Sequence, residues 1–92
     1  MKITIEYNGQ LRHLAQRESD VLDIAEGTSI PEAVAQAAAS YDESFQVILF
    51  DSQGELLPSA LVLMHDEPVN REQWPTLTDG DVLTLLPPIA GG

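Results

Sequence analysis

The chain contains no cysteine, and this absence constrains its folding more than any other feature of the sequence. A single domain of 92 residues buries only roughly 60% of the surface that its unfolded chain exposes, so a disulfide or a structural metal would be a natural source of extra stability. Without thiols the chain can form neither a disulfide nor a thiolate zinc site, and no side chain can carry a persulfide. We therefore expect one small domain that is stabilised by its hydrophobic core, and any covalent chemistry must use another group.

The strongly negative net charge indicates which classes of partner the chain can bind. Fifteen acidic residues stand against four basic ones, and the resulting charge of -11 repels phosphate backbones and anionic lipid surfaces. We expect no nucleic acid and no membrane as partner and regard a basic protein surface as the better candidate, although the charge could also serve only solubility. The longest strictly apolar run, residues 60–64, is far shorter than the roughly 18 residues of a membrane span, and the first residues form no apolar signal region. A cytoplasmic protein is the resulting expectation.

Alternation of apolar and polar residues predicts two strands near the start of the chain. Within residues 1–7 the odd positions are apolar, which is the period of a strand with one buried face. Asp20–Ala25 also alternates and predicts a second strand, whose buried face stays open because Leu22 and Ile24 compete with Val21. The segment between the two strands is too long for a two-residue hairpin loop, so it must contain further structure.

Two helical segments follow from local patterns. Apolar residues at helical spacing over Leu11–Ala15 predict a short helical turn. A longer helix should begin at Ser29, because Ser29 and Glu32 form a capping-box pattern and Pro31 is tolerated in the first helical turn. This helix should end near Ser40. Its apolar stripe includes small residues that let a helix lie close to a sheet, and it comprises Ile30, Val34, Ala37, Ala38 and Tyr41.

The patterns are weaker after this helix. Residues 42–59 contain one apolar run, 47–50, which could be a buried strand or one helical turn, and the sequence leaves both open. Apolar residues flank a polar turn within 61–69 and predict a hairpin. After a second turn at 78–81, the final strand is predicted at Val82–Leu86.

No arrangement of side chains in the sequence indicates catalysis. His13 and His65 lie far apart with no thiols near either, so we expect surface or turn histidines rather than a metal site. The carboxylates show no spacing that would single out an acid and a base. Trp74, in a polar loop, is expected to cover the edge of the core, with a partner contact as the alternative. The sequence therefore predicts a protein that is not itself an enzyme.

The end of the sequence carries the strongest functional signal. Pro87 and Pro88 cannot donate hydrogen bonds to a sheet, so residues 87–92 should leave a domain of residues 1–86 as an extended flexible tail. The two terminal glycines lack a Cβ, so such a tail could enter a channel too narrow for other residues and present its α-carboxylate there. This carboxylate is ionised and inert at neutral pH and reacts only when it is activated, usually as a mixed anhydride with AMP. A frayed end without function is the alternative.

Taken together, these features resemble the ubiquitin-like sulfur carriers of the ThiS and MoaD type. The resemblance covers nearly the whole chain and is supported by the segment Leu11–Ala15 and by the helix that begins at Ser29. Its most specific part is Asp79–Asp81, the strand that follows, and an ending similar to that of MoaD, Leu86-Pro87-Pro88-Ile89-Ala90-Gly91-Gly92. The resemblance implies an α+β protein with the β-grasp fold, in which one main helix packs on one face of a mixed sheet.

Within such a fold, helix and sheet should share a core made of Ile3, Ile5, Val34, Leu83 and Leu85. Alternation along the final strand places Leu86 on the opposite face, where it should be exposed. An exposed leucine beside the tail would be a candidate anchor for a partner.

For function, the resemblance implies that an E1-like adenylating enzyme of the MoeB or ThiF type activates Gly92 with ATP. Sulfur from a donor then replaces AMP, and the resulting C-terminal thiocarboxylate passes its sulfur on. The first candidate acceptor is the molybdopterin precursor in a complex with a large synthase subunit, and thiamine thiazole or cysteine synthesis are alternatives. The chain itself would bind no cofactor, and ATP would be used by the activating enzyme. The residues expected to contact partners are Leu86, Pro87, Pro88, Ile89, Ala90 and Gly91.

Two other functions are compatible with the same ending. A ubiquitin-like modifier would join the activated Gly92 to a target lysine through an isopeptide bond, and the sole lysine of this chain, Lys2, argues only against long self-linked chains. A simple binding module would leave the tail unmodified.

Overall fold

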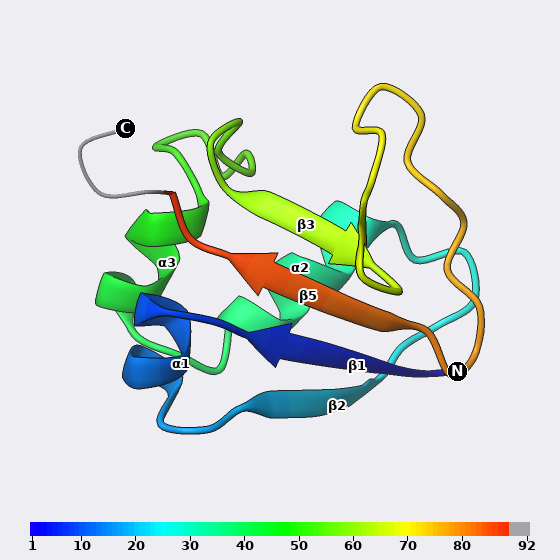
Figure 1. Cartoon of the computed structure of the whole chain (residues 1–92), viewed down its shortest axis with the longest axis horizontal. Coiled ribbons are helices and arrows are strands. Elements are labelled where there is room, and N and C mark those ends of the chain that lie inside the picture. The colour runs from blue at the N-terminus through cyan, green and yellow to red at the C-terminus, as the bar shows by residue number, and fades with distance from the viewer. Residues whose placement is uncertain (89–92) are drawn as a thin grey trace.

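Five strands form a single mixed sheet in the computed structural model, which describes residues 1–88 (Figure 1). The strands are β1 (Lys2–Tyr7), β2 (Ser19–Asp23), β3 (Leu61–Met64), β4 (Glu67–Pro68) and β5 (Val82–Leu86). Their order across the sheet is β2-β1-β5-β3-β4, with β1 and β5 parallel and every other neighbouring pair antiparallel. The first and last strands of the chain therefore lie side by side at the centre of the sheet.

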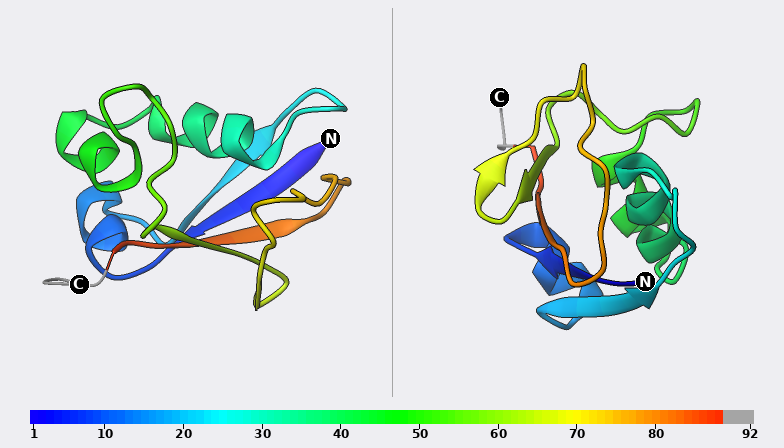
Figure 2. Two further views of the ribbon diagram at one scale, coloured as in Figure 1. Left: turned by 90° about the horizontal axis from the view of Figure 1, so that it is seen from above. Right: turned by 90° about the vertical axis from the view of Figure 1, so that its right-hand side faces the viewer.

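Three helices accompany the sheet: α1 (Gln10–Ala15), α2 (Ile30–Ala38) and α3 (Glu43–Leu49). Figure 2 shows α2 and α3 on one side of the sheet and α1 at the end where β1 finishes. No helix within residues 1–88 covers the other side of the sheet, which we call the open face, and none in this part of the chain is long and apolar enough to cross a membrane. The arrangement confirms the β-grasp fold with α2 as its main helix, α1 confirms the helical turn predicted at Leu11–Ala15, and α3 lies in the segment that the sequence left open.

The main helix begins where the capping box predicts. The Ser29 hydroxyl accepts a hydrogen bond from the Glu32 N–H at 3.2 Å, and the Glu32 carboxylate accepts one from the Ser29 N–H at 3.0 Å. Both bonds satisfy backbone N–H groups that a helix start otherwise leaves without partners. Ala33, Ala37 and Ala38 are buried, and their small side chains let α2 lie close to the sheet.

The segment that the sequence left open between strand and helix contains α3. Phe45 and Leu49, one helical turn apart, are both buried in the core. In a strand, Val47 and Leu49 would share one face, whereas in α3 the side chain of Val47 is 58% exposed and that of Leu49 is fully buried. The helical alternative is correct because this spacing buries two large side chains against α1 and the sheet.

The predicted core is confirmed. The five residues assigned to it have no exposed surface: Ile3, Ile5, Val34, Leu83 and Leu85. The open question about β2 is also settled, because Ile24 is buried and Leu22 packs against the core, while Val21 is 64% exposed on the open face.

Leu86 differs from its expected exposure. It lies on the open face, opposite to Leu85, but it is half-buried rather than fully exposed. The register pairs Leu86 with Leu61 of β3, and two leucines facing each other across strands cover part of each other's surface. Leu61 itself remains 47% exposed.

A carboxylate in β2 ties this edge strand to the helical side. Both oxygens of Asp20 accept hydrogen bonds. Oδ2 accepts from the hydroxyl of Tyr7, at 2.7 Å, and from the hydroxyl of Tyr41. Oδ1 accepts from the Arg17 guanidinium at 2.6 Å. The ring of Tyr7 meets those of Tyr41 and Phe45 edge to face. Burial by itself would raise the pKa of Asp20, but the hydrogen bonds from both tyrosines and Arg17 outweigh it and hold this pKa below its usual value.

This network predicts a specific acid dependence of stability. The pKa of Asp20 in the folded state lies below its unfolded value of about 3.9, so charged Asp20 stabilises the fold above that pH and the contribution disappears as the pH falls through the folded-state pKa. Asp20→Asn should lower the free energy of unfolding by about 1–3 kcal/mol near pH 7, because the amide cannot accept all three bonds. In urea unfolding experiments, this difference should shrink as the pH falls below about 4.

The matched control lies on the same strand. Asp23, whose side chain is 78% exposed and faces the N-terminal ammonium at 3.7 Å, should tolerate Asp23→Asn with little loss at any pH. A difference between the wild type and Asp20→Asn that stays constant down to the lowest pH would contradict the assignment of the acid-sensitive contribution to Asp20.

Candidate functional site

The predicted tail starts at the end of the central strand. β5 ends at Leu86, and the Pro87 and Pro88 that follow have no N–H to continue a ladder on either side. The last contact on the β1 side is a hydrogen bond from the Asn8 N–H to the carbonyl oxygen of Leu85, at 3.2 Å. The direction in which the chain leaves the sheet is therefore set by the turn that connects β1 to α1.

Gly9 in this turn permits a close approach to the start of the tail. Its φ is +55°, and a Cβ placed there would lie 3.4 Å from Cγ of Pro87. A side chain at this position would be strained by the positive φ, whereas its Cβ would make ordinary contact with the proline ring. The Asn8–Gly9 turn thus lies directly beside Pro87.

The predicted site residues divide into two groups. Leu86, Pro87 and Pro88 are half-buried at the end of β5, beside the turn at Gly9. Ile89, Ala90, Gly91 and Gly92 lie outside the described residues, so their part in the site stays a prediction.

The open face supplies an apolar surface next to this exit. The strand register brings Leu61 beside Leu86, and Leu63 and Val82 lie on the same face. Near the centre, the Thr84 hydroxyl donates to the Glu6 carboxylate at 3.1 Å. An apolar area of this kind, with a polar centre and no covering helix among residues 1–88, is suited to binding another protein.

A small polar hollow lies beside the same turn. It has a volume of about 220 Å³ and is lined by residues 6–8, Arg12, Glu18 and Ser19. The Arg12 guanidinium donates from Nε to the carbonyl oxygen of Tyr7 at 3.3 Å. Arg12 thus places one of the few positive charges of this acidic chain close to the turn that supports the tail.

The histidines have the positions expected of them. His13 is exposed on α1, and His65 lies in the turn between β3 and β4, where its Nε2 is 2.8 Å from Oδ1 of Asp81. The other oxygen of Asp81 accepts hydrogen bonds from the N–H and the hydroxyl of Thr78. Within the part of the chain that the structure describes, no group of three or more potential metal-binding side chains comes together.

Trp74 covers the edge of the core, as expected, and it also stacks with a residue whose role the sequence did not indicate. The Arg71 guanidinium lies 5.4 Å from the centre of the Trp74 ring. It donates to three backbone carbonyls at 2.9–3.0 Å, those of Leu56, Leu57 and Ala60. An arginine three residues before a tryptophan in a polar loop was the signal for this contact, which joins the loop after α3 to the loop after β4.

Comparison with known proteins extends these observations. The model of the ThiS family matches residues 5–92. The structure is similar to SAMP1, the small archaeal modifier protein 1 of Haloferax volcanii, with a TM-score of 0.86, 21% identity and 100% coverage of both chains. It is also similar to Urm1 from Trypanosoma brucei, with a TM-score of 0.75 and 27% identity over 99% of this chain and 95% of that one.

A third similar structure is a chain in the complex of subunits 1 and 2 of the molybdopterin-converting factor from Helicobacter pylori 26695. The TM-score is 0.62, the identity 21% and the coverage 100% of both chains. A search of curated proteins finds no match.

The two neighbouring leucines at the end of β5 should respond differently to truncation. Leu85→Ala removes a fully buried side chain from the core and should lower the free energy of unfolding by about 2–5 kcal/mol. Leu86→Ala, on the open face, should cost well under half of that, because its side chain is only half-buried. Urea unfolding of both variants tests the assignment, and a larger loss for Leu86→Ala than for Leu85→Ala would show that the strand register is wrong.

Proposed function

The chain belongs to the ThiS family of ubiquitin-like sulfur carrier and modifier proteins, and on this premise we propose that it carries sulfur as a thiocarboxylate on Gly92. The observation that carries the proposal is the extent of the family match, which runs to residue 92 and so includes the Gly-Gly ending. The lack of cysteine supports it, because a chain without thiols can hold transferable sulfur only at such a carboxyl group.

The proposed chemistry has two steps at the carboxyl group of Gly92. A carboxylate oxygen of Gly92 attacks the α-phosphorus of ATP, pyrophosphate leaves, and the terminus becomes a mixed anhydride with AMP. Hydrosulfide from a sulfide-level donor then attacks the carbonyl carbon, AMP leaves with the C–O bonding pair, and loss of the thiol proton gives the thiocarboxylate, so a C–S bond replaces a C–O bond. ATP is bound and consumed by an E1-like adenylating enzyme, while the carrier supplies the carboxylate and no catalytic side chain.

The described part of the chain supports such a role by its geometry. The tail starts from the central strand, where β1 and β3 hold β5 from both sides and the Gly9 turn supports Pro87. The open face next to this exit offers Leu61 and Leu86 as apolar contacts for the activating enzyme. The net charge of -11 favours encounter with a basic surface on that enzyme.

For the acceptor of the sulfur, we propose the molybdopterin precursor, bound in a complex of this chain with a large synthase subunit. The MoaD-like ending and the similarity to a chain of the Helicobacter pylori molybdopterin-converting factor complex support this choice. The open face would then serve both partners in turn, first the activating enzyme and later the synthase subunit.

A protein modifier is the second candidate. The similarity to small archaeal modifier protein 1 and to Urm1 favours it, and the same activated Gly92 would form an isopeptide bond with a target lysine. Both functions need adenylation, so only the fate of the activated carboxyl group separates them.

The intact mass of the protein purified from sulfur-replete cells should distinguish these functions. A sulfur carrier should show a fraction whose mass corresponds to the exchange of one oxygen for one sulfur. A modifier should instead appear in adducts that are larger by the mass of a target protein. If both species are absent while the activating enzyme is active, the chain acts as a binding module and the proposal is wrong.

Variants of the last residue test whether activation occurs there. Deleting Gly92 withdraws the carboxylate by at most about 3.6 Å, which is far more than positioned catalysis tolerates, and adding one residue moves it beyond the reactive position. Gly92→Val adds a branched side chain in a channel expected to fit none. All three variants should fold normally but fail in ATP–pyrophosphate exchange with the activating enzyme. Lys2→Arg, at the opposite end of the chain, should exchange normally.

Full exchange activity of the deleted or the extended variant would exclude Gly92 as the activated residue. It would then exclude the carrier and the modifier together.

A further inference from the structure

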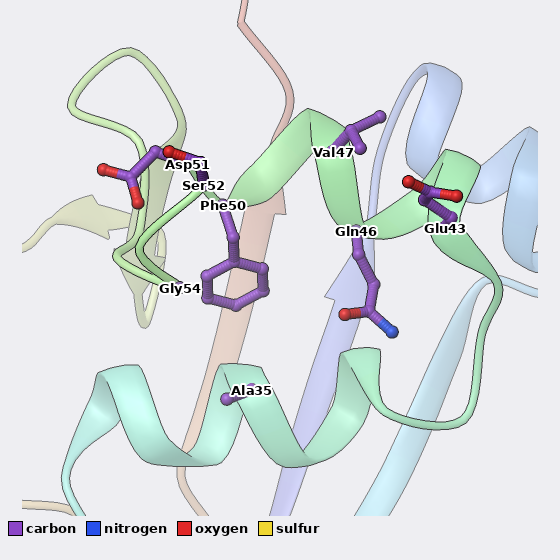
Figure 3. Close-up of a pocket in the computed structure, with 8 residues that line it drawn as sticks. All are labelled: Ala35, Glu43, Gln46, Val47, Phe50, Asp51, Ser52 and Gly54. Carbon is purple, nitrogen blue, oxygen red and sulfur yellow. The ribbon is translucent and has the colours of Figure 1, made fainter.

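A second surface feature lies on the helical side of the sheet, away from the open face. A cleft of about 640 Å³ lies between α2 on one side and α3 with the loop that follows it on the other (Figure 3). Clefts that bind ligands commonly have volumes of roughly 300–1,000 Å³. None of the residues assigned above to the tail exit or the open face lines this cleft, so the proposed sulfur chemistry gives it no role.

The centre of the cleft is apolar. Figure 3 shows the ring of Phe50 in the gap between α3 and α2, with Ala35 of α2 facing it. Val47 lies at the rim of the cleft, where its side chain points away from α2 in Figure 3, and it is 58% exposed. Among residues 1–88, the other large apolar side chains that are exposed, Val21 and Leu61, both lie on the open face. Val47 therefore marks a separate apolar surface that the fold leaves accessible.

The charged groups around this centre are carboxylates, and Gln46 and Ser52 add neutral polar side chains. Glu43 and Asp51 stand at opposite ends of the cleft. The amide nitrogen of Gln46 donates to the carbonyl oxygens of Ala38 and Tyr41, at 3.3 and 3.2 Å, which orients the side chain so that its oxygen faces the gap. Neither lysine nor arginine is among the residues that line it.

An apolar centre between two carboxylates is complementary to one kind of occupant. We propose that the cleft binds a segment of a partner protein that presents an apolar side chain next to arginine or lysine residues. The apolar side chain would contact Val47 and Phe50, and the cationic groups would approach Glu43 and Asp51. A second copy of this chain is a poor occupant, because its own charge of -11 opposes self-association.

The cleft lies away from the surfaces assigned to sulfur transfer. Because the cleft and the open face lie on opposite sides of the sheet, a partner in the cleft leaves the tail exit and the open face free. The chain can thus be held by one protein while its tail is handled by another. This inference goes beyond sulfur transfer, and it does not depend on whether Gly92 is activated.

The experiment is an NMR titration of the full-length, isotope-labelled chain with defined probes in about 0.1 M salt. The main probe is a short capped peptide with a central leucine between two arginines. Its amide shift changes should be confined to α2, α3 and residues 50–54. The same peptide with serine in place of leucine, or glutamate in place of arginine, should bind at least about tenfold more weakly.

Matched variants locate the binding site. Val47→Ser should weaken binding of the arginine–leucine peptide about tenfold, whereas Val21→Ser, at an equally exposed valine on the open face, should not change it. Glu43→Gln should weaken binding about threefold, and Glu26→Gln, at an exposed position away from the cleft, should have no effect. Each variant must keep the amide spectrum of a folded protein, which is expected at these exposed positions.

Three outcomes would overturn the proposal. In the first, the peptide shifts residues of the open face, or Val21→Ser abolishes its binding. In the second, capped arginine alone binds as tightly as the peptide, which would make the cleft a cation site rather than a docking site for a protein segment. In the third, the free protein self-associates in sedimentation experiments and Val47→Ser abolishes this, which would make the occupant a second copy. The pyrophosphate exchange activity of Val47→Ser should equal that of the wild type, so a failure of this proposal is separate from a failure of the sulfur-carrier proposal.

Discussion

The parallel pairing of β1 with β5 is the contact on which the rest of the structure depends. It joins the first and last strands at the centre of the sheet and aligns Ile5 with Leu83 and Tyr7 with Leu85, which together form the surface on which the helices pack. Pairing two strands from opposite ends of the chain closes a loop of nearly all its residues, and this closure costs conformational entropy. The burial of these apolar side chains must offset that cost. The same pairing fixes the position at which β5 ends, because β5 is paired with β1 up to Leu85 and with β3 up to Leu86.

The two sides of the sheet have different physical roles. On the helical side, apolar side chains are buried and supply the stability of the domain, whereas the open face keeps a partly exposed apolar area beside the tail. A family of carriers and modifiers needs this separation, because the surface that meets partners must stay accessible without weakening the core. The net charge of -11 belongs to the domain as a whole and repels other acidic molecules.

Hydrogen-bonded side chains take the place of the covalent links that this chain cannot form. Arg71 joins two loops through three carbonyls, and Asp20 joins the edge strand to the helical side through two tyrosines. Among the described residues, every buried side-chain nitrogen and oxygen has a hydrogen-bond partner. Polar networks that are fully satisfied in this way favour one unique arrangement of a small core, while an unpaired buried group would be costly.

Local sequence patterns alone determined much of the fold. The alternation in β1 and β5 and the capping box at Ser29 are local patterns, and the Gly-Gly ending is a property of the sequence itself. The five core residues followed from this alternation once the resemblance had implied the β-grasp fold. Tertiary packing decided the rest: that α3 is a helix, that Leu61 half-buries Leu86, and that Arg71 meets its three carbonyls. The cleft between α2 and α3 belongs to this second group as well. The physical reason is that each of these features depends on groups from different elements that meet only in the folded domain, such as β3 with β5 or Arg71 with the loop after α3. Short-range periodicity in a sequence does not indicate which of these surfaces will meet.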